Sequence, residues 1–288
     1  MYFRSKLDNI VKKNNSLLCV GLDSDIDKLP ISIRNGEHPQ STFNRAIIEA
    51  THDLVCAFKP NTAFYESRGK AGIEALKTTC DFLKETYPDI IIILDAKRAD
   101  IGNTNEGYVQ FAFDYLGADA ITLHPYLGKE ALKPFLDRKD KGFFILCRTS
   151  NPGAGEFQDL LLSKSQPSDS AFAAASAKEG TPLYQIVAEH VVQDWNYNGN
   201  CGLVVGATYP NELEIVRRIA KDLPLLIPGI GAQGGDTEKT VKAGVDNDGQ
   251  NTIINSSRGI IFASEGENFA EKSRVEAEKL RDDINKFR

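Results

Sequence analysis

Eight short apolar runs recur along the chain, and a polar turn and then a stretch with helical periodicity follow almost every one. Runs that are apolar throughout are typical of strands buried on both faces, as in parallel sheets covered by helices. The alternation therefore predicts an α/β protein. The runs are residues 17–22, 54–58, 90–94, 120–123, 143–146, 202–205, 225–227 and 252–254.

Helical periodicity marks the stretches between these runs, among them residues 41–53, 72–86, 104–116, 183–195, 211–221 and 269–286. Capping side chains such as Ser41, Asn211 and Asp236 stand at their expected starts. Eight strand and helix units predict closure into a (β/α)8 TIM barrel, with the active site at the C-terminal ends of the strands. An open doubly wound sheet is the alternative, because periodicity does not distinguish a closed sheet from one with edges. We expect residues 1–288 to form one domain.

Charge and hydropathy exclude several classes of function. The net charge is −6, the pI is about 5.4 and no basic run is present, which argues against a nucleic-acid partner. The longest apolar stretch, residues 90–94, is too short to cross a membrane, and the polar start does not resemble a signal peptide. The five cysteines are widely spaced without C-x-x-C, which predicts buried thiols rather than a metal or redox site. We therefore expect a cytoplasmic protein.

One segment interrupts the regular alternation of strands and helices. Residues 156–180 are rich in Ser, Ala and Lys, contain Pro167 and extend the connection after the fifth strand well beyond the usual length. Because that connection leaves the C-terminal end of a strand, we expect this extended loop to border the active site.

The segment LDAKRADIGNT, residues 94–104, carries the strongest chemical signal. Residues two apart in a strand point the same way, so Asp95 and Lys97 should both face the barrel interior, with Asp100 in the turn that follows. Lys59, at the end of the second strand, should stand beside Asp95. Such an array can keep a lysine protonated as a general acid next to an ionised carboxylate. An ordinary salt-bridged strand end is the alternative interpretation.

A second signal lies in the last quarter of the chain. The segment IPGIGAQGGD, residues 227–236, reads as a strand, a glycine-rich turn and a helix start, and Arg258 follows the eighth strand. Glycines let backbone N–H groups approach an anion, and arginine offers a bidentate fork to phosphate oxygens. The loops after strands seven and eight are the recurrent phosphate site of barrel enzymes. The pattern predicts a phosphate group in the substrate.

Two further positions are less specific. Asp23 ends the first strand, where it could accept hydrogen bonds from substrate hydroxyls or serve as a cap or turn residue. After the fifth strand, Thr149, Ser150 and Asn151 could read a heterocyclic amide, although SNPG is also a good turn sequence.

In combination, these motifs resemble the orotidine 5′-phosphate decarboxylase family across nearly the whole chain. FKPNTAFYE and RTSNPGAGEFQDL are similar to its longer bacterial-type branch. The resemblance implies cofactor-free decarboxylation of orotidine 5′-monophosphate to uridine 5′-monophosphate in pyrimidine biosynthesis. It also implies a homodimer with shared sites.

The resemblance further implies a role for each matching residue. Lys97 would protonate C6 of the pyrimidine, Asp95 would lie next to the leaving carboxylate, and Lys59 would hold the array and a ribose hydroxyl. The neighbouring subunit would contribute Asp100, Ile101 and Thr104. The remaining substrate contacts would be Asp23 to the ribose, Ser150 or alternatively Thr149 to the pyrimidine, and Gln233 and Arg258 to the phosphate.

Other interpretations use the same barrel framework. A Mg²⁺-dependent sugar-phosphate lyase or synthase needs carboxylate ligands, and Lys59 would repel the metal. A Schiff-base aldolase needs a neutral amine, whereas the neighbouring carboxylates keep Lys97 charged. A non-catalytic barrel that binds a phosphate ligand would be free to lose a member of the charged array, yet Lys59, Asp95, Lys97 and Asp100 are all present.

Overall fold

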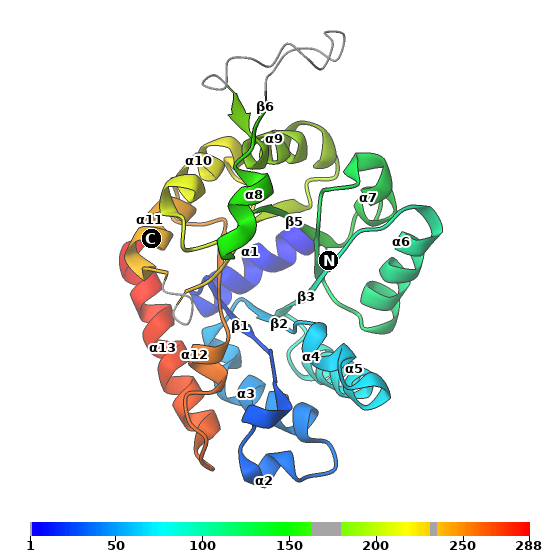
Figure 1. Ribbon diagram of the computed structural model, residues 1–288. Coiled ribbons are helices and arrows are strands. Elements are labelled where there is room, and N and C mark those ends of the chain that lie inside the picture. Colours follow the sequence, from blue (N-terminus) through cyan, green and yellow to red (C-terminus); the bar gives the residue numbers. More distant parts are fainter. Residues whose placement is uncertain (1, 163–179, 231–234) are drawn as a thin grey trace.

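Eight parallel strands close into a barrel in the computed structural model, which describes residues 2–162, 180–230 and 235–288 (Figure 1). Each of the eight predicted runs contributes one barrel strand. The ring is closed because the last strand pairs with the first, with Leu18 opposite Ile254, so the open-sheet alternative is excluded. In order around the barrel, the strands are β1 (Leu18–Gly21), β2 (Ala57–Lys59), β3 (Ile91–Arg98), β4 (Ala120–Leu123), β5 (Gly142–Arg148), β8 (Cys201–Val205), β9 (Leu225–Pro228) and β10 (Thr252–Ser256).

Helices surround this ring (Figure 1). The longer ones are α3 (Pro39–Thr51), α5 (Gly69–Thr86), α6 (Gly102–Val109), α7 (Gly128–Leu136), α9 (Leu183–His190), α10 (Pro210–Ala220), α11 (Thr237–Gly244) and α13 (Phe269–Phe287). Short helices are α2 (Ile31–Arg34), α4 (Ala63–Glu66), α8 (Gly155–Gln158) and α12 (Arg258–Ile261). Both α6 and α9 continue into π-helical turns, η3 (Gln110–Tyr115) and η5 (Val191–Trp195).

Two of the three expected caps are wrong. Asp236 accepts a hydrogen bond from Lys239 N and caps α11 as predicted. However, α3 and α10 both begin at a proline, which is favoured in the first helical turn because its missing N–H has no intrahelical partner there. Ser41 and Asn211 consequently lie inside their helices.

One helix is not among the predicted elements, namely α1 (Phe3–Asn14), which packs against the barrel through Phe3. The Phe3 ring meets the Phe144 ring edge to face, with 5.8 Å between centroids. Gly142 permits this approach, since a Cβ there would lie 2.5 Å from the Phe3 ring. The helix therefore buries its apolar face where β5 begins.

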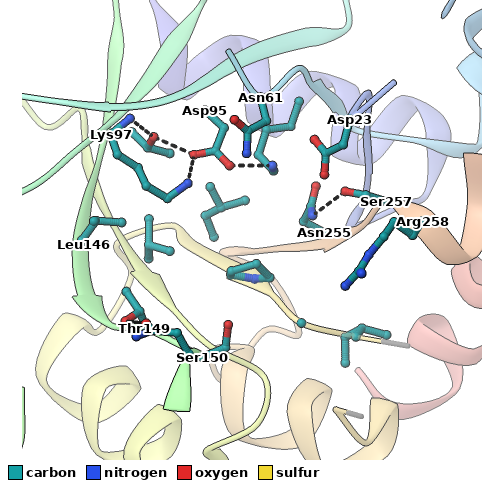
Figure 2. Close-up of a pocket in the computed structure, with 18 of the residues that line it drawn as sticks. Asp23, Asn61, Asp95, Lys97, Leu146, Thr149, Ser150, Asn255, Ser257 and Arg258 are labelled. Carbon is teal, nitrogen blue, oxygen red and sulfur yellow. Dashed lines mark hydrogen bonds and ion pairs between the residues drawn. The ribbon is translucent and has the colours of Figure 1, made fainter. Parts of the chain in front are cut away.

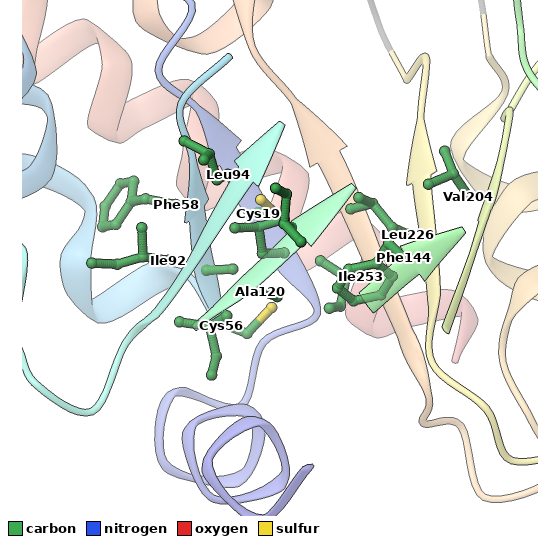
Figure 3. Packing of buried hydrophobic residues seen from close by; sticks show 14 of the residues in the cluster. Cys19, Cys56, Phe58, Ile92, Leu94, Ala120, Phe144, Val204, Leu226 and Ile253 are labelled. Atoms are coloured by element: carbon green, nitrogen blue, oxygen red, sulfur yellow. The ribbon is translucent and has the colours of Figure 1, made fainter. Parts of the chain in front are cut away.

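Buried apolar side chains pack in and around the barrel below its C-terminal end, and Figure 3 shows part of this cluster. Asp95 and Leu146 face a cavity at that end, so alternation along the strands places Ile93 and Phe144 one layer deeper. Both are fully buried. All five cysteines are buried free thiols, as predicted. Because this layer of the barrel is filled with apolar side chains, polar chemistry is restricted to the C-terminal ends of the strands.

The predicted long connection lies between β5 and α9. It contains α8 and then β6 (Leu161–Leu162), which pairs antiparallel with β7 (Thr181–Pro182), whereas residues 163–179 lie outside the described parts of the chain. In those described parts, every helix is too short or too polar to span a bilayer.

Candidate active site

A cavity of about 640 Å³ opens at the C-terminal ends of the strands, where the fold predicts the active site (Figure 2). Its walls are built from inward-facing side chains at the ends of the strands and from the loops that follow. Six of the ten predicted site residues line it, namely Asp23, Lys59, Asp95, Lys97, Ser150 and Arg258.

Asp95 lies between two ammonium groups. Lys59 Nζ donates a hydrogen bond of 2.9 Å to its Oδ2, and Lys97 Nζ donates one of 2.6 Å to its Oδ1. The side chains of Lys59 and Asp95 are buried, whereas that of Lys97 is 49% exposed. Lys97 is therefore the member of the array that is most accessible to a substrate and to solvent.

The surroundings favour the charged forms of the buried pair. Burial opposes ionisation of Asp95, but the ammonium groups of Lys59 and Lys97 outweigh it and hold the pKa of that carboxyl well below its usual range. Burial likewise lowers the pKa of Lys59, but the negative charges of Asp95 and Asp23 outweigh this effect and raise it above its ordinary value. The cavity thus contains a fixed carboxylate beside fixed ammonium charges.

A bend at the end of β3 brings Lys97 to this position. Its φ of 47° lies in the left-handed region, and the register with β4 shifts between Leu94 and Arg98. The hydroxyl of Thr122 accepts a 2.9 Å hydrogen bond from Lys97 N and donates one of 2.9 Å to Asp95 Oδ1. Asp95 and Lys97 face the same cavity as predicted, but regular strand alternation is not the reason. Backbone strain of this kind concentrates at functional sites.

Three predicted residues lie outside this cavity of their own chain. Asp100 accepts a hydrogen bond from Ile101 N at 2.7 Å, and its own N–H donates to Asn105 Oδ1 at 2.7 Å. Neither Asp100, Ile101 nor Thr104 is among the described residues that line the cavity. The Ile101 side chain is 60% exposed. Within one chain the charged array therefore has three members in contact rather than four.

Asp23, Asn255, Ser257 and Arg258 lie on the opposite side of the cavity from Lys97 (Figure 2). Asp23 Oδ1 and Asn255 Oδ1 are buried without a hydrogen-bond partner in the described parts of the chain. Gly21 allows Ser257 to approach β1, since a Cβ there would lie 1.9 Å from Ser257 Oγ. On this side of the cavity, Asp23 and Asn255 offer hydrogen-bond acceptors for the hydroxyl groups of a ligand, and the Arg258 guanidinium can bind an anionic group. Gln233, the other predicted phosphate contact, lies outside the described residues.

The third side of the cavity follows β5. Thr149 Oγ1 donates to Asn151 Oδ1 at 2.6 Å and accepts from Gln158 Nε2 at 2.9 Å, and Thr149 N donates to Gln158 Oε1 at 2.8 Å. The Thr149 hydroxyl proton is thus committed within the protein. Gln158 is in α8, so the described part of the long connection borders the cavity as predicted.

The buried guanidinium of Arg148 anchors this side. It forms two hydrogen bonds to the Asp159 carboxylate, at 2.8 and 3.0 Å, and lies 4.0 Å above the centroid of the Tyr209 ring. Bidentate pairs of this kind are geometrically specific. Asp159 directly follows α8, so the pair fixes that helix against the end of β5.

Several polar residues of the cavity are not among the predicted site residues. Thr122 stands at an inward-facing position near the end of an otherwise apolar strand, and Asn255 directly follows the predicted strand run 252–254; these positions are the signals that could have identified them. Asn61, in the FKPN motif, also lines the cavity. The other missed residues are Lys28, Gln158 and Ser257.

The carboxylate of Asp95 is already occupied by two cations, which leaves it poorly suited to hold a metal ion. In residues 2–162, 180–230 and 235–288, no three His, Cys, Asp or Glu side chains come together in a group that could bind one.

Comparison with known proteins identifies the family. Residues 16–273 match the model of the orotidine 5′-phosphate decarboxylase / HUMPS family. The chain belongs to this family. The orotidine 5′-phosphate decarboxylase of Thermomicrobium roseum is 48% identical over 100% of this chain and 96% of the relative. That of Cupriavidus necator is 46% identical over 100% of this chain and 99% of the relative.

Solved structures of the orotidine 5′-phosphate decarboxylase family share the barrel. The OMP decarboxylase of Leishmania donovani aligns with a TM-score of 0.81 at 36% identity, covering 100% of this chain and 99% of that one. The enzyme of Methanocaldococcus jannaschii, complexed with the inhibitor BMP, aligns with a TM-score of 0.64 at 23% identity, over 93% of this chain and 98% of that one, and supports the fold alone.

Proposed function

We propose that the chain decarboxylates orotidine 5′-monophosphate to UMP in this cavity, and that Lys97, Asp95 and Lys59 carry the chemistry. One observation above all supports the proposal. A buried carboxylate is held between two ammonium groups, and one of these, on Lys97, is exposed to the cavity. The reaction is the one named for the relatives that match this chain along its whole length.

Decarboxylation at C6 of the pyrimidine needs charge stabilisation. When the bond between C6 and the carboxylate breaks, the electron pair stays on C6 in an orbital within the ring plane, so the ring π system does not delocalise it. A preorganised ammonium aimed at that position stabilises the developing charge without solvent reorganisation. Lys97 then transfers a proton from Nζ to C6, forming UMP, and is reprotonated by solvent through its exposed side.

Asp95 acts on the ground state and Lys59 keeps it in place. A substrate carboxylate next to the fixed charge of Asp95 is repelled, and the repulsion disappears as CO₂ departs. Lys59 donates a hydrogen bond to Oδ2 of Asp95, and its positive charge keeps the Asp95 carboxylate ionised. No step in this sequence requires an electron sink, so we expect no cofactor.

The rest of the cavity binds the nucleotide. Arg258 is the phosphate contact on this chain, together with Gln233, and Asp23 accepts from the ribose. Ser150, or alternatively Thr149, is the pyrimidine contact, since both residues line the cavity after β5. Binding energy gained at the phosphate offsets the forced proximity of the two carboxylates.

The active unit is a homodimer in this proposal. Asp100 and Thr104 do not line the cavity of their own chain, and Ile101 beside them exposes a large apolar side chain. In the dimer that the family resemblance implies, the second copy would cover this side chain. Asp100, Ile101 and Thr104 would complete the neighbouring site.

We also propose that the whole chain works as one domain, because the barrel strands extend from Leu18 to Ser256.

A cytoplasmic location fits the five buried free cysteines, since unpaired thiols are typical of reducing compartments.

The decisive experiment is incubation of the purified protein with orotidine 5′-monophosphate while the pyrimidine absorbance is followed. We expect conversion to UMP with release of CO₂, and full activity after exhaustive treatment with EDTA. No consumption of the nucleotide would refute the proposal. Loss of activity with EDTA and recovery with Mg²⁺ would favour the metal-dependent sugar-phosphate chemistry of related barrels.

A further inference from the structure

Asn255 is a buried polar residue to which the proposed mechanism gives no role. It lies near the end of β10, is 5% exposed and lines the active-site cavity. Its Nδ2 donates a long hydrogen bond of 3.4 Å to Ser257 Oγ. Its Oδ1 is buried and has no hydrogen-bond partner in the described parts of the chain. A buried acceptor without a donor destabilises the folded state, so its presence calls for an explanation.

A second unpartnered acceptor lies on the same side of the cavity. Asp23 Oδ1 is also buried without a partner among the described residues (Figure 2). Asp23 lies close enough to Lys59 for its charge to help raise the pKa of that lysine, yet the hydrogen bond that Lys59 makes to a carboxylate goes to Asp95. This part of the site is therefore rich in acceptors and poor in donors. It is complementary to a ligand group that brings O–H donors.

The position of Asn255 indicates which part of a nucleotide that group is. Arg258 follows three residues later and marks the phosphate end, whereas Lys97 marks the reacting carbon of the base. In a nucleotide the ribose joins these two ends, and its hydroxyl groups are the donors between them. Asn255 and Asp23 lie beside Arg258 and across the cavity from Lys97 (Figure 2).

We propose that Asn255 determines sugar specificity by accepting a hydrogen bond from a ribose hydroxyl through Oδ1, so that the site selects ribonucleotides over the deoxyribonucleotide that lacks this hydroxyl. This inference rests on the proposed function, because it assumes that a nucleotide occupies the cavity. A site with a buried acceptor rejects the analogue without the donor, since binding that analogue leaves the acceptor unpaired.

The test compares Asn255→Ala and Asn255→Leu with the wild-type protein on orotidine 5′-monophosphate and its 2′-deoxy and 3′-deoxy analogues. We expect both variants to lower kcat/KM for the ribonucleotide about 10- to 100-fold. On the analogue that lacks the contacted hydroxyl, variants and wild type should agree within about threefold. Because Oδ1 is unpaired in the free protein, Asn255→Leu should unfold at the same or a higher urea concentration than wild type.

Asn200→Ala provides a matched control. Asn200 is 4% exposed and also has a buried Oδ1 without a partner in the described chain, but it lies outside the cavity. It donates to Arg138 O and Lys141 O, so its loss should lower stability without changing the ratio of kcat/KM between ribo- and deoxyribonucleotides.

Failure of this inference differs from failure of the proposed function. If both Asn255 variants lose the same factor on all three nucleotides, Asn255 has only a structural role and the inference is wrong. If the wild-type protein does not decarboxylate orotidine 5′-monophosphate, the proposed function fails instead. In that case, calorimetry measures the affinities of wild type and of the Asn255 variants for UMP and its 2′- and 3′-deoxy analogues, which tests the hydroxyl contact without turnover. If the variants lose the same factor in affinity for all three nucleotides, the inference about Asn255 is again wrong.

Discussion

Lys59 Nζ lies 2.9 Å from Asp95 Oδ2, and the side chains of both residues are almost fully buried. The other oxygen of Asp95 accepts from Lys97 and from Thr122. Asp95 is therefore the centre of the array, because every other member depends on it for a partner. A fixed carboxylate of this kind can act on a substrate without rearranging.

The first prediction concerns the stability of the array. Asp95→Asn leaves two lysines without their common counter-charge, and we expect the free energy of unfolding to fall by about 3 kcal/mol or more. Lys59→Met should cost less, about 1–2 kcal/mol, because Asp95 retains Lys97 and Thr122. Urea unfolding monitored by circular dichroism measures both values. Equal losses in the two variants would contradict the central position of Asp95.

The pH dependence of that difference is the second prediction. The pKa of Asp95 is lowered from 3.8, so its contribution to stability is present above pH 3.8 and is lost as the pH falls through the lowered value. The pKa of Lys59 is raised from 10.5, so its contribution is present below pH 10.5 and is lost at still higher pH. The stability difference between wild type and Asp95→Asn should therefore be constant from about pH 5 to 7, because at higher pH the buried Lys59 of the variant, without Asp95 to raise its pKa, begins to lose its proton. A steady decline within that window would show that one of the pair titrates there.

Two substitutions at opposite sides of the cavity should separate chemistry from binding. Lys97→Ala should lower kcat at least about 10⁴-fold, because it removes the proton donor and the charge next to C6. The half-exposed Lys97 side chain should contribute little to folding. Arg258→Ala should mainly raise KM, because it removes a phosphate contact. Steady-state kinetics with orotidine 5′-monophosphate measures both, and near wild-type turnover by Lys97→Ala would refute the proposed mechanism.

Apolar patterning predicted the barrel because each strand is buried on both faces and so forms a continuous run. The same patterning did not predict α1, whose Phe3 docks on β5 through tertiary contacts that local sequence does not encode. The caps at Ser41 and Asn211 were wrong because a proline two residues or one residue earlier begins the helix. Local rules therefore located the elements better than their ends.

Charged residues in the site were predictable because burial of a charge at the end of an apolar strand is costly without a purpose. Thr122 was missed because a single neutral polar residue in an apolar run is common, and Asn255 because Asn and Ser after an apolar run are typical of a turn. Whether the side chain of such a polar residue faces the cavity depends on the register of its strand. The left-handed bend at Lys97 was also not predictable, since it depends on the hydrogen bond from its N–H to Thr122 on a neighbouring strand.

The shared site gives a fourth prediction. Lys97→Ala and Asp100→Ala should each be inactive alone, yet a mixture of the two chains should recover activity, because one site in each heterodimer combines an intact Lys97 with an intact Asp100. Random exchange of equal amounts gives about a quarter of wild-type activity, since half of the dimers carry one intact site. Native mass spectrometry verifies the exchange. Absence of rescue despite complete exchange would remove the proposal that Asp100 acts in the neighbouring site.

Gly206, which directly follows β8, controls the position of Ser150 and gives the last prediction. A Cβ on Gly206 would lie 2.7 Å from both Ser150 N and Ser150 Cβ, so the alanine variant must push the end of β5 away. We expect Gly206→Ala to raise KM about 10-fold and to lower the free energy of unfolding by about 1–3 kcal/mol. Gly266→Ala is the control, because its Cβ would meet only flexible side-chain ends at 3.3 Å or more. If Gly206→Ala loses stability but keeps the wild-type KM, Ser150 does not contact the substrate, because its displacement would then leave binding unchanged.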